Sequence, residues 1–246
     1  TLDGDEWIIN GHKLWPTNSG GVADLFGVVC STNPGSRAPE DFAFIFVPAD
    51  TPGVTQGKPY QKAGMAADKN SDIWFENVRV PAHYRAHGPG DDLRYFKEVV
   101  SFGLLGSMAF TSGVLLNTYE LLQDFTARTY FRGRPLKEND DVAALLSDFA
   151  ARMETVRVLG YQHARMIDRS DLYGDPWSDE VVAKGRAFKY LTADLGVQCL
   201  RQAMDLLGAH GSDRRADVEK HWRDFKIVQL WMGGKQLCQM EVARWY

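Results

Sequence analysis

The residues best suited to chemistry lie near the end of the chain, in the stretch RDFKIVQLWMGGKQL at residues 223–237. An apolar helical pattern runs as far as Trp231, breaks at Gly233-Gly234, and is followed by a second helical run, Gln236 to Trp245. Each Gly inside a helix costs about 1 kcal/mol relative to Ala, so one helix should end here and another begin. Backbone N–H groups at the start of the second helix could bind an acyl carbonyl or a phosphate. A plain loop between two core helices is the alternative interpretation.

Residues 1–81 have the pattern of β structure. Short runs rich in Val, Ile, Phe and Trp alternate with turn residues. Asn10-Gly11 predicts a hairpin turn between strands at Trp7–Ile9 and Lys13–Trp15. The last alternating run ends at Pro81, which should close its strand. Many short strands separated by turns predict a small antiparallel barrel or sandwich.

The rest of the chain has a helical pattern. Apolar or small residues spaced by three or four from Ala143 to Ala164 mark one face of a long helix. Ser178 is the expected N-cap of another helix, which Gly208 should end. Four or five long helices of this kind indicate a bundle. The predicted fold class is therefore α+β: a small antiparallel β-barrel or sandwich domain at residues 1–85, followed by a C-terminal four-helix bundle at residues 90–246.

The composition is that of an ordinary globular protein, with 44% hydrophobic residues and a net charge of -4. This charge gives no reason to expect nucleic acid or an acidic membrane as a partner, and no apolar run is expected to reach the roughly 18 residues of a membrane span. Cys30, Cys199 and Cys238 lie far apart without a CxxC motif, which indicates free thiols in a reducing, cytoplasmic compartment and no metal site. Because strand-like sequence begins directly at Thr1, we expect the beginning of the natural protein to be missing or to lie on another chain.

The 223–237 stretch resembles, without a gap, the closing motif RDAKIxQIYEGTSQI of the acyl-CoA dehydrogenase family. In that family, the Glu of the YEG triplet is the general base that removes the α-proton of the acyl-CoA. Met232 stands at its position here, between Trp231 and Gly233. Some members carry their base on the first helix of the C-terminal domain, which corresponds to Gly103, next to a substrate-side Arg that corresponds to Leu104. The resemblance implies a substrate pocket at these five residues and leaves the catalytic base unidentified.

Further motifs imply an FAD site. DGDEWIINGHKLWPTN resembles DGDxWxxNGxKxWITN, in which the Trp packs on the flavin ring and the Thr bonds flavin N5. An isoalloxazine needs an apolar wall, and a hydroxyl near N5 suits its reduced form. RTYFRGRPL resembles RxxFGxPL, whose Arg reaches the FAD of the adjacent subunit, and DLLGAHG resembles QxLGGxG, a turn against the FAD pyrophosphate. The FAD-binding residues implied in this way are Trp15, Thr17, Asn18, Arg128, Arg132, Gly208, Gly211 and Gln236. From the residues alone, Trp15 could instead be a core residue of a hairpin, and Arg128 and Arg132 could be an ordinary pair of surface residues.

The resemblance implies an FAD-dependent oxidoreductase that carries out α,β-dehydrogenation of a CoA thioester, with the usual base missing. Loss of a positioned base costs on the order of 10²–10⁴-fold in rate. One alternative is therefore a non-catalytic subunit that completes a partner's site in a heteromeric acyl-CoA dehydrogenase. A flavin monooxygenase on the same fold is a second alternative. The implied partners are an acyl-CoA substrate, further subunits in a homo- or hetero-oligomer (dimer or tetramer), and an electron-transfer flavoprotein as a candidate acceptor.

Overall fold

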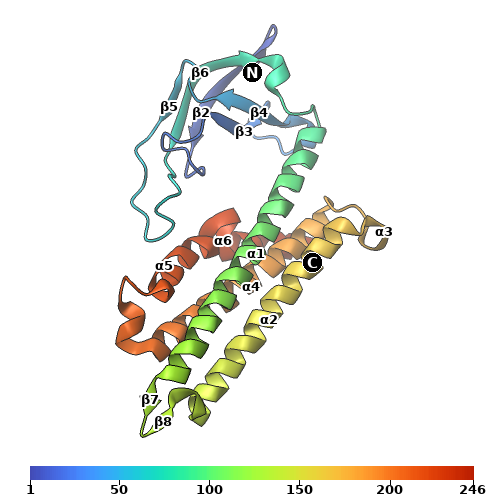
Figure 1. Ribbon diagram of the computed structural model, residues 1–246. Helices are drawn as coiled ribbons and strands as arrows, with labels where there is room; N and C mark the ends of the chain where they lie inside the picture. The colour runs from blue at the N-terminus through green and yellow to red at the C-terminus, as the bar shows by residue number, and fades with distance from the viewer. The chain divides into compact units, whose positions relative to one another are not determined.

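The structure is a computed structural model that describes residues 1–246 (Figure 1). It divides into two compact units, Thr1–Glu98 and Val99–Tyr246. The first unit contains antiparallel strands and the second consists mainly of long helices. This arrangement confirms the predicted α+β class, with β structure first and helices after it.

The first unit has two antiparallel sheets. The larger sheet has the strand order β1-β2-β6-β5 and the smaller one pairs β3 with β4. The strands are β1 (Leu2–Asp3), β2 (Glu6–Lys13), β3 (Leu25–Ser31), β4 (Phe42–Pro48), β5 (Val54–Gln56) and β6 (Ile73–Pro81), with single 3-10 turns η1 (Pro39–Asp41) and η2 (Ala82–Tyr84). The last strand ends at Pro81, as predicted.

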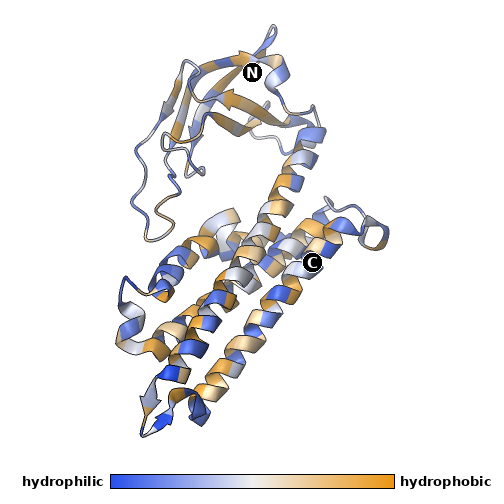
Figure 2. Cartoon of the chain, viewed as in Figure 1, coloured by the Kyte–Doolittle hydropathy of each residue, from blue (hydrophilic) through white to orange (hydrophobic).

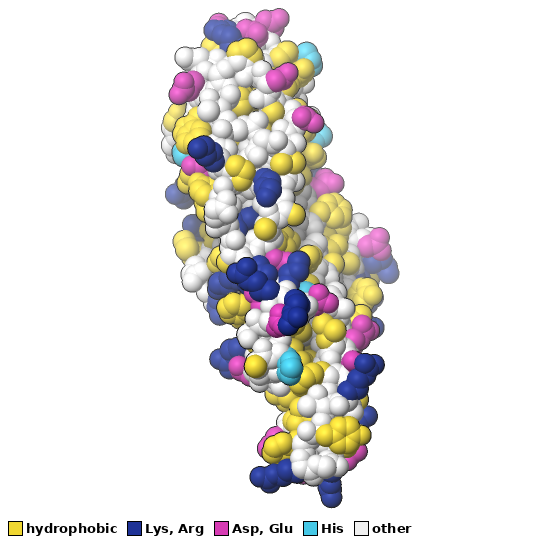
Figure 3. All heavy atoms as spheres, turned by 60° about the vertical axis from the view of Figure 1, so that its left-hand side comes forward, with side chains coloured by type: hydrophobic (Ala, Val, Ile, Leu, Met, Phe, Trp, Pro, Cys, Tyr) yellow, Lys and Arg dark blue, Asp and Glu magenta, His cyan; other side chains and the backbone are white.

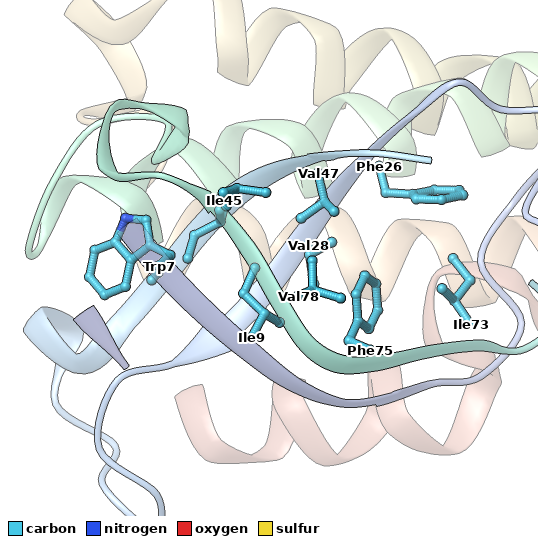
Figure 4. Close-up of a cluster of buried hydrophobic side chains, with 11 residues drawn as sticks. Trp7, Ile9, Phe26, Val28, Ile45, Val47, Ile73, Phe75 and Val78 are labelled. Atoms are coloured by element: carbon cyan, nitrogen blue, oxygen red, sulfur yellow. The ribbon is translucent and has the colours of Figure 1, made fainter. Parts of the chain in front are cut away.

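The core of the first unit lies between its two sheets. Successive side chains along a strand point to opposite faces, so every second residue faces the interior, and these residues are apolar here. Figure 4 shows these side chains from both sheets pointing toward one another. The buried cluster includes Trp7, Ile9, Phe26, Val28, Ile45, Val47, Ile73, Phe75 and Val78.

Asn10-Gly11 does not turn the chain, so the predicted hairpin at this position is wrong. β2 continues through both residues and pairs with β6 on either side, with a shift of register between Ile9 and Gly11. The Asn10 side-chain oxygen accepts the backbone N–H of Asn77 at 2.8 Å, across the sheet. Asn10 stands opposite two residues of β6, Glu76 and Asn77, so the β-bulge lies in β6, where Asn77 has a left-handed φ of 51°. The chain continues straight through Asn10-Gly11 because β6 pairs with both halves of β2.

The second unit is a bundle of long helices joined by short turns. The helices are α1 (Asp91–Arg128, whose first residues belong to the first unit), α2 (Asp140–Asp168), α3 (Ser170–Tyr173), α4 (Asp179–Leu207), α5 (Asp217–Leu230) and α6 (Gly234–Trp245). The connections include the hairpin β7 (Tyr130–Phe131) and β8 (Arg134–Pro135), and the turns η3 (Leu136–Glu138), η4 (Gly208–Ser212) and η5 (Trp231–Gly233). Ser178 Oγ accepts the N–H of Val181 at 3.3 Å, and α4 ends before Gly208, so both predicted ends of this helix are confirmed.

Helix α1 contains a longer apolar run than predicted from the sequence. Residues 99–116 carry no charge, and by length and composition α1 could cross a membrane, so the expectation that no apolar run reaches this length was wrong. In the bundle, however, α1 supplies core residues: Leu104, Leu115 and Leu122 are fully buried. Figure 2 shows apolar and polar residues alternating around the other long helices, as expected when one face packs on a core.

Charges of both signs are mixed on the molecular surface. Figure 3 shows Lys and Arg side chains lying among Asp and Glu on the face that it displays. Several form pairs one helical turn apart, such as Lys220–Asp224 and Arg223–Glu219. Pairs of this kind add only a few tenths of a kcal/mol each, about 0.3–0.5, so burial rather than surface charge must stabilise the bundle.

A buried histidine lies among three helices of the bundle. The His163 side chain is fully buried, and its Nε2 lies 3.3 Å from the carbonyl oxygen of Ser101. Its Nδ1 has no hydrogen-bond partner. A methyl group at Gly185 would overlap the imidazole ring, so the close approach of α4 requires glycine there. Burial lowers the pKa of His163 because the charged imidazolium would lose its hydration.

This histidine should make the bundle sensitive to acid. In the unfolded chain it binds a proton near pH 6.5, whereas in the folded chain it stays neutral to lower pH. Its contribution to stability is therefore complete above about pH 6.5 and is lost as the pH falls toward the folded pKa, by up to about 1.4 kcal/mol per pH unit. We expect His163→Gln to reduce this slope in urea unfolding followed by helical circular dichroism. His83→Gln, at an exposed position, is the control, and equal slopes in both variants would contradict the assignment.

Candidate functional site

The turn between α5 and α6 has an unusual backbone. Met232 has φ 52° and ψ 30°, Gly233 has φ 101°, and Gly234 has φ 56°. Left-handed φ values suit glycine but are costly for a side chain such as that of methionine. The predicted break between two helices is confirmed, and a non-glycine residue in this conformation must be held by its surroundings.

A buried lysine from α4 holds the first part of this turn. Lys189 Nζ donates to the carbonyl oxygens of Trp231 at 2.7 Å and Gln229 at 3.2 Å. Only 1% of Lys189 is exposed, and burial lowers its pKa. The last carbonyls of a helix lack partners within the helix and carry partial negative charge. The ammonium group therefore caps the C-terminal end of α5 from inside the bundle.

Two further contacts tie the turn to neighbouring helices. Arg186 of α4 donates from Nη1 to the Met232 carbonyl at 3.3 Å, and its Nε is paired with Glu241 of α6. Trp231 donates from its indole Nε1 to Ser107 Oγ of α1 at 2.5 Å. The turn is thus anchored directly to α1 and α4, and Glu241 of α6 holds the Arg186 side chain that binds it.

The Met232 side chain lies against Gly103 of α1. A Cβ atom added at Gly103 would be 2.6 Å from Met232 Cε and 3.1 Å from its Sδ, so the methionine occupies the space that the missing side chain leaves. The structure therefore brings together the two positions at which the family was expected to carry its base. Neither a glycine nor a thioether can take a proton. Leu104, the predicted neighbour, is fully buried in the bundle.

The ionisable groups around the turn are already engaged. Lys189 binds two carbonyls, and Arg186 binds a third while pairing with Glu241. Lys235, at the start of α6, is paired with Asp194. The arrangement can fix a backbone and present an apolar surface, but these residues do not offer a free carboxylate at position 103 or 232.

The predicted flavin wall lies in the first unit. Trp15 is 51% exposed, and its backbone has a left-handed φ of 61°. Thr17 is exposed and, with Lys13, Leu14 and Pro16, lines a cleft of about 400 Å³ between strands β2 and β3. Thr17 follows Trp15 by two residues, and an exposed indole and a cleft lined by a hydroxyl are the kinds of group that a planar, partly polar ring system needs. Asn18 is partly buried, and its backbone N–H donates to Asp68 Oδ1 at 3.2 Å, so it shapes the turn that carries Thr17.

The remaining predicted cofactor residues lie in the second unit. Arg128 ends α1 and Arg132 is at the tip of the β7–β8 hairpin, and both are exposed. In Figure 1 this hairpin is at the end of the bundle away from α6, which carries Gln236 in its first turn. Gly208 and Gly211 belong to the turn η4 after α4. A Cβ at Gly211 would lie 2.9 Å from the Met204 carbonyl oxygen, so this glycine is needed for the turn itself.

Sequence reasoning missed the residues that hold the 231–234 turn. They are Ser107, Arg186, Lys189 and Glu241. One signal was available for Lys189, which follows Gly185 by four residues and precedes Ala193 by four, on the small-residue face of α4. A lysine on a buried face needs acceptors, and the ends of neighbouring helices supply them.

Family models match almost the whole chain. Residues 1–78 match the middle domain of acyl-CoA dehydrogenase and residues 93–246 match its C-terminal domain. The chain belongs to the acyl-CoA dehydrogenase family. It is 28% identical over 242 residues to cyclohexane-1-carbonyl-CoA dehydrogenase of Syntrophus aciditrophicus (strain SB), covering 98% of this chain and 60% of that protein. It is 26% identical to the mitochondrial short-chain specific acyl-CoA dehydrogenase of Rattus norvegicus, covering 98% of this chain and 56% of that protein.

Solved structures show the same fold at lower identity. Butyryl-CoA dehydrogenase from Megasphaera elsdenii has a TM-score of 0.86 at 23% identity, covering 98% of this chain and 61% of that one. Nitroalkane oxidase has a TM-score of 0.89 at 22% identity, covering 99% of this chain and 60% of that one. The acyl-CoA dehydrogenase fold is therefore shared with proteins of different stated activity, and the fold alone does not choose among them.

The buried cap on α5 gives a direct prediction for stability. Lys189→Met should leave the carbonyls of Trp231 and Gln229 without their donor and lower the free energy of unfolding by about 2 kcal/mol. Lys184→Met is the matched control, because Lys184 is on the same helix but only pairs with Glu180 one turn away. That variant should change stability by less than about 0.5 kcal/mol. Urea unfolding of both variants would measure this, and equal losses would contradict the capping role.

Proposed function

We propose that this chain is part of an FAD-dependent oxidoreductase of acyl-CoA dehydrogenase type that acts on a CoA thioester by α,β-dehydrogenation. The observation that carries the proposal is the turn at 231–234, where the family motif ends one helix and begins the next and whose backbone Lys189 and Arg186 hold in place. The exposed indole of Trp15, and the cleft that Thr17 lines two residues later, support the proposal of a flavin site. The relatives named above span more chain than this one, so the activity of the whole protein, and its location in the cytoplasm, belong to the proposal.

Three residues of the chain have separate roles in the proposed reaction. When bound, FAD supplies the hydride acceptor for the β-carbon. Trp15 provides an apolar wall for the flavin ring, and the Thr17 hydroxyl donates to it. The backbone N–H of Met232 is the proposed donor to the thioester carbonyl, which would acidify the α-carbon. Proton removal must then come from a group other than residues 103 and 232.

A second candidate is a partner-completing subunit of a heteromeric acyl-CoA dehydrogenase. The contact between Met232 and Gly103 favours it, because it fills the space of both family base positions with one apolar side chain. Such a chain would keep the fold and its interfaces while another subunit carried out the dehydrogenation. Co-purification with a related chain that carries Glu at the position of Met232 would support this candidate over the first.

Assembly is the next expectation of the proposal. Arg128 and Arg132 are exposed at the end of the bundle, where they are proposed to reach the FAD of a neighbouring protomer. Long guanidinium side chains suit phosphate recognition across an interface. We expect a dimer or a dimer of dimers in light scattering. A monodisperse monomer that retains flavin would contradict this part of the proposal.

Restoring the carboxylate tests the proposal directly. Met and Glu have similar lengths, so Met232→Glu should place a carboxyl group beside Gly103 in apolar surroundings that raise its pKa toward a useful range. We expect flavin bleaching by a saturated acyl-CoA under anaerobic conditions to accelerate, on the order of 10²-fold or more. Met240→Glu, at an exposed methionine on α6, is the control and should leave the rate unchanged.

The opposite outcome would be equally informative. If the unaltered chain already bleaches fully with such a thioester, and Met232→Glu slows the reaction, the base lies elsewhere and Met232 does not face the α-carbon. In that case, the assignment of the 231–234 turn to the substrate site would be wrong.

A further inference from the structure

We infer that Tyr60 is a positioning residue of the flavin site, which rests on the proposed function above. The Tyr60 ring stacks on the Trp15 indole, with ring centroids 3.9 Å apart and planes within 8° of each other. Trp15 remains 51% exposed in this arrangement, so part of the indole is still open to a ligand. The tyrosine thus backs the surface on which a flavin ring would lie.

The tyrosine is itself held in place. Its hydroxyl donates to Asp72 Oδ1 at 2.5 Å, and the other oxygen of Asp72 lies 3.2 Å from His12 Nε2. His12 in turn stacks on Trp74, with centroids 4.8 Å apart. A hydrogen bond to an ionised carboxylate is roughly twice as strong as one between neutral groups. The bond to Asp72 raises the pKa of Tyr60, which keeps the hydroxyl protonated as a donor.

The backbone of Trp15 is tied to the same loop. Asn70 Nδ2 donates to the carbonyl oxygens of Trp15 at 3.1 Å and Pro16 at 3.2 Å. Asp68 accepts the backbone N–H of Asn18 and pairs with Lys62 at 3.0 Å. Residues 60–72 therefore fix both the main chain and the ring of the tryptophan. Since the left-handed backbone of Trp15 is intrinsically unfavourable, these contacts are needed to keep the indole in one orientation.

Fixing the indole in advance should strengthen flavin binding. When the indole is already ordered in the free protein, ligand binding does not lose the conformational entropy of ordering it. Stacked aromatic pairs contribute enough beyond simple burial that losing Tyr60 should weaken FAD binding about 3- to 10-fold. Phenylalanine would keep the stacking and lose only the bond to Asp72, so it should retain most of the effect.

The test measures three variants, Tyr60→Leu, Tyr60→Phe and Asp72→Asn. Trp15→Ala, which removes the indole itself, is the reference for complete loss of this flavin contact. FAD affinity is measured by titration of the full chain. The state of the indole is followed separately by fluorine NMR of 5-fluorotryptophan protein, with the Trp15 signal assigned from Trp15→Phe. We expect Tyr60→Leu to weaken FAD binding and to shift and broaden the Trp15 signal. Tyr60→Phe and Asp72→Asn, which change only the bond and keep the stacked ring, should both retain most of the binding and the Trp15 signal, and the exposed control Tyr161→Leu should change neither.

The outcomes separate this inference from the proposed function. If Trp15→Ala weakens FAD binding but Tyr60→Leu leaves both affinity and the Trp15 signal unchanged, Tyr60 has no positioning role. Tighter FAD binding in Tyr60→Leu would show that the tyrosine occupies the place of the flavin, and would also overturn the inference. Failure of the unaltered chain to bind FAD would refute the proposed function, and this role of Tyr60 with it.

Discussion

The geometry of the turn at 231–234 depends on one buried cation, Lys189. Lys189 reaches from α4 to the C-terminal end of α5 and binds the carbonyls of Gln229 and Trp231. A buried ammonium is unfavourable unless its protons are bonded, and the exposed carbonyls at a helix end are unfavourable unless they find donors. The hydrogen bonds from Lys189 to these carbonyls satisfy both the buried ammonium group and the helix end. The helix must therefore stop where it does, and the next residues turn in a left-handed conformation.

This constraint explains how the turn can keep its shape whichever side chain stands at position 232. The turn is held through backbone carbonyls of residues 229, 231 and 232, which are the same groups whatever the side chain at 232. The scaffold is consequently independent of the residue that the family uses for proton removal. Met232 then fills the space above Gly103 by packing, which apolar groups do well and charged groups do poorly.

Local signals in the sequence predicted most of the fold. The Ser178 cap, the Gly208 stop and the break at Gly233-Gly234 were predicted because each depends on residues adjacent in the chain. The hairpin predicted at Asn10-Gly11 was wrong because these residues also fit within a continuous strand, and only pairing with the distant strand β6 decides between the two. The apolar length of α1 was overlooked because Gly and Ser interrupt it.

The candidate site was predictable only in part. Family motifs indicated which positions matter, but not the long-range contacts of Lys189, Arg186 and Tyr60, because these connect residues 40 or more apart in the chain. No local pattern states which carbonyl or ring a side chain will meet. A polar residue on an otherwise apolar helix face indicates that this side chain is buried and needs a partner. The sequence does not indicate which residue that partner is.

Met232 is proposed to stand at the base position, against Gly103 and facing the bound thioester. Methyl NMR of protein labelled at the methionine ε-carbons tests this placement, with the Met232 signal assigned from Met232→Leu. On titration with a saturated acyl-CoA, we expect the Met232 methyl signal to shift with saturable dependence on ligand, while that of the exposed Met240 stays in place. Saturable binding of the thioester that leaves the Met232 signal unmoved would contradict it.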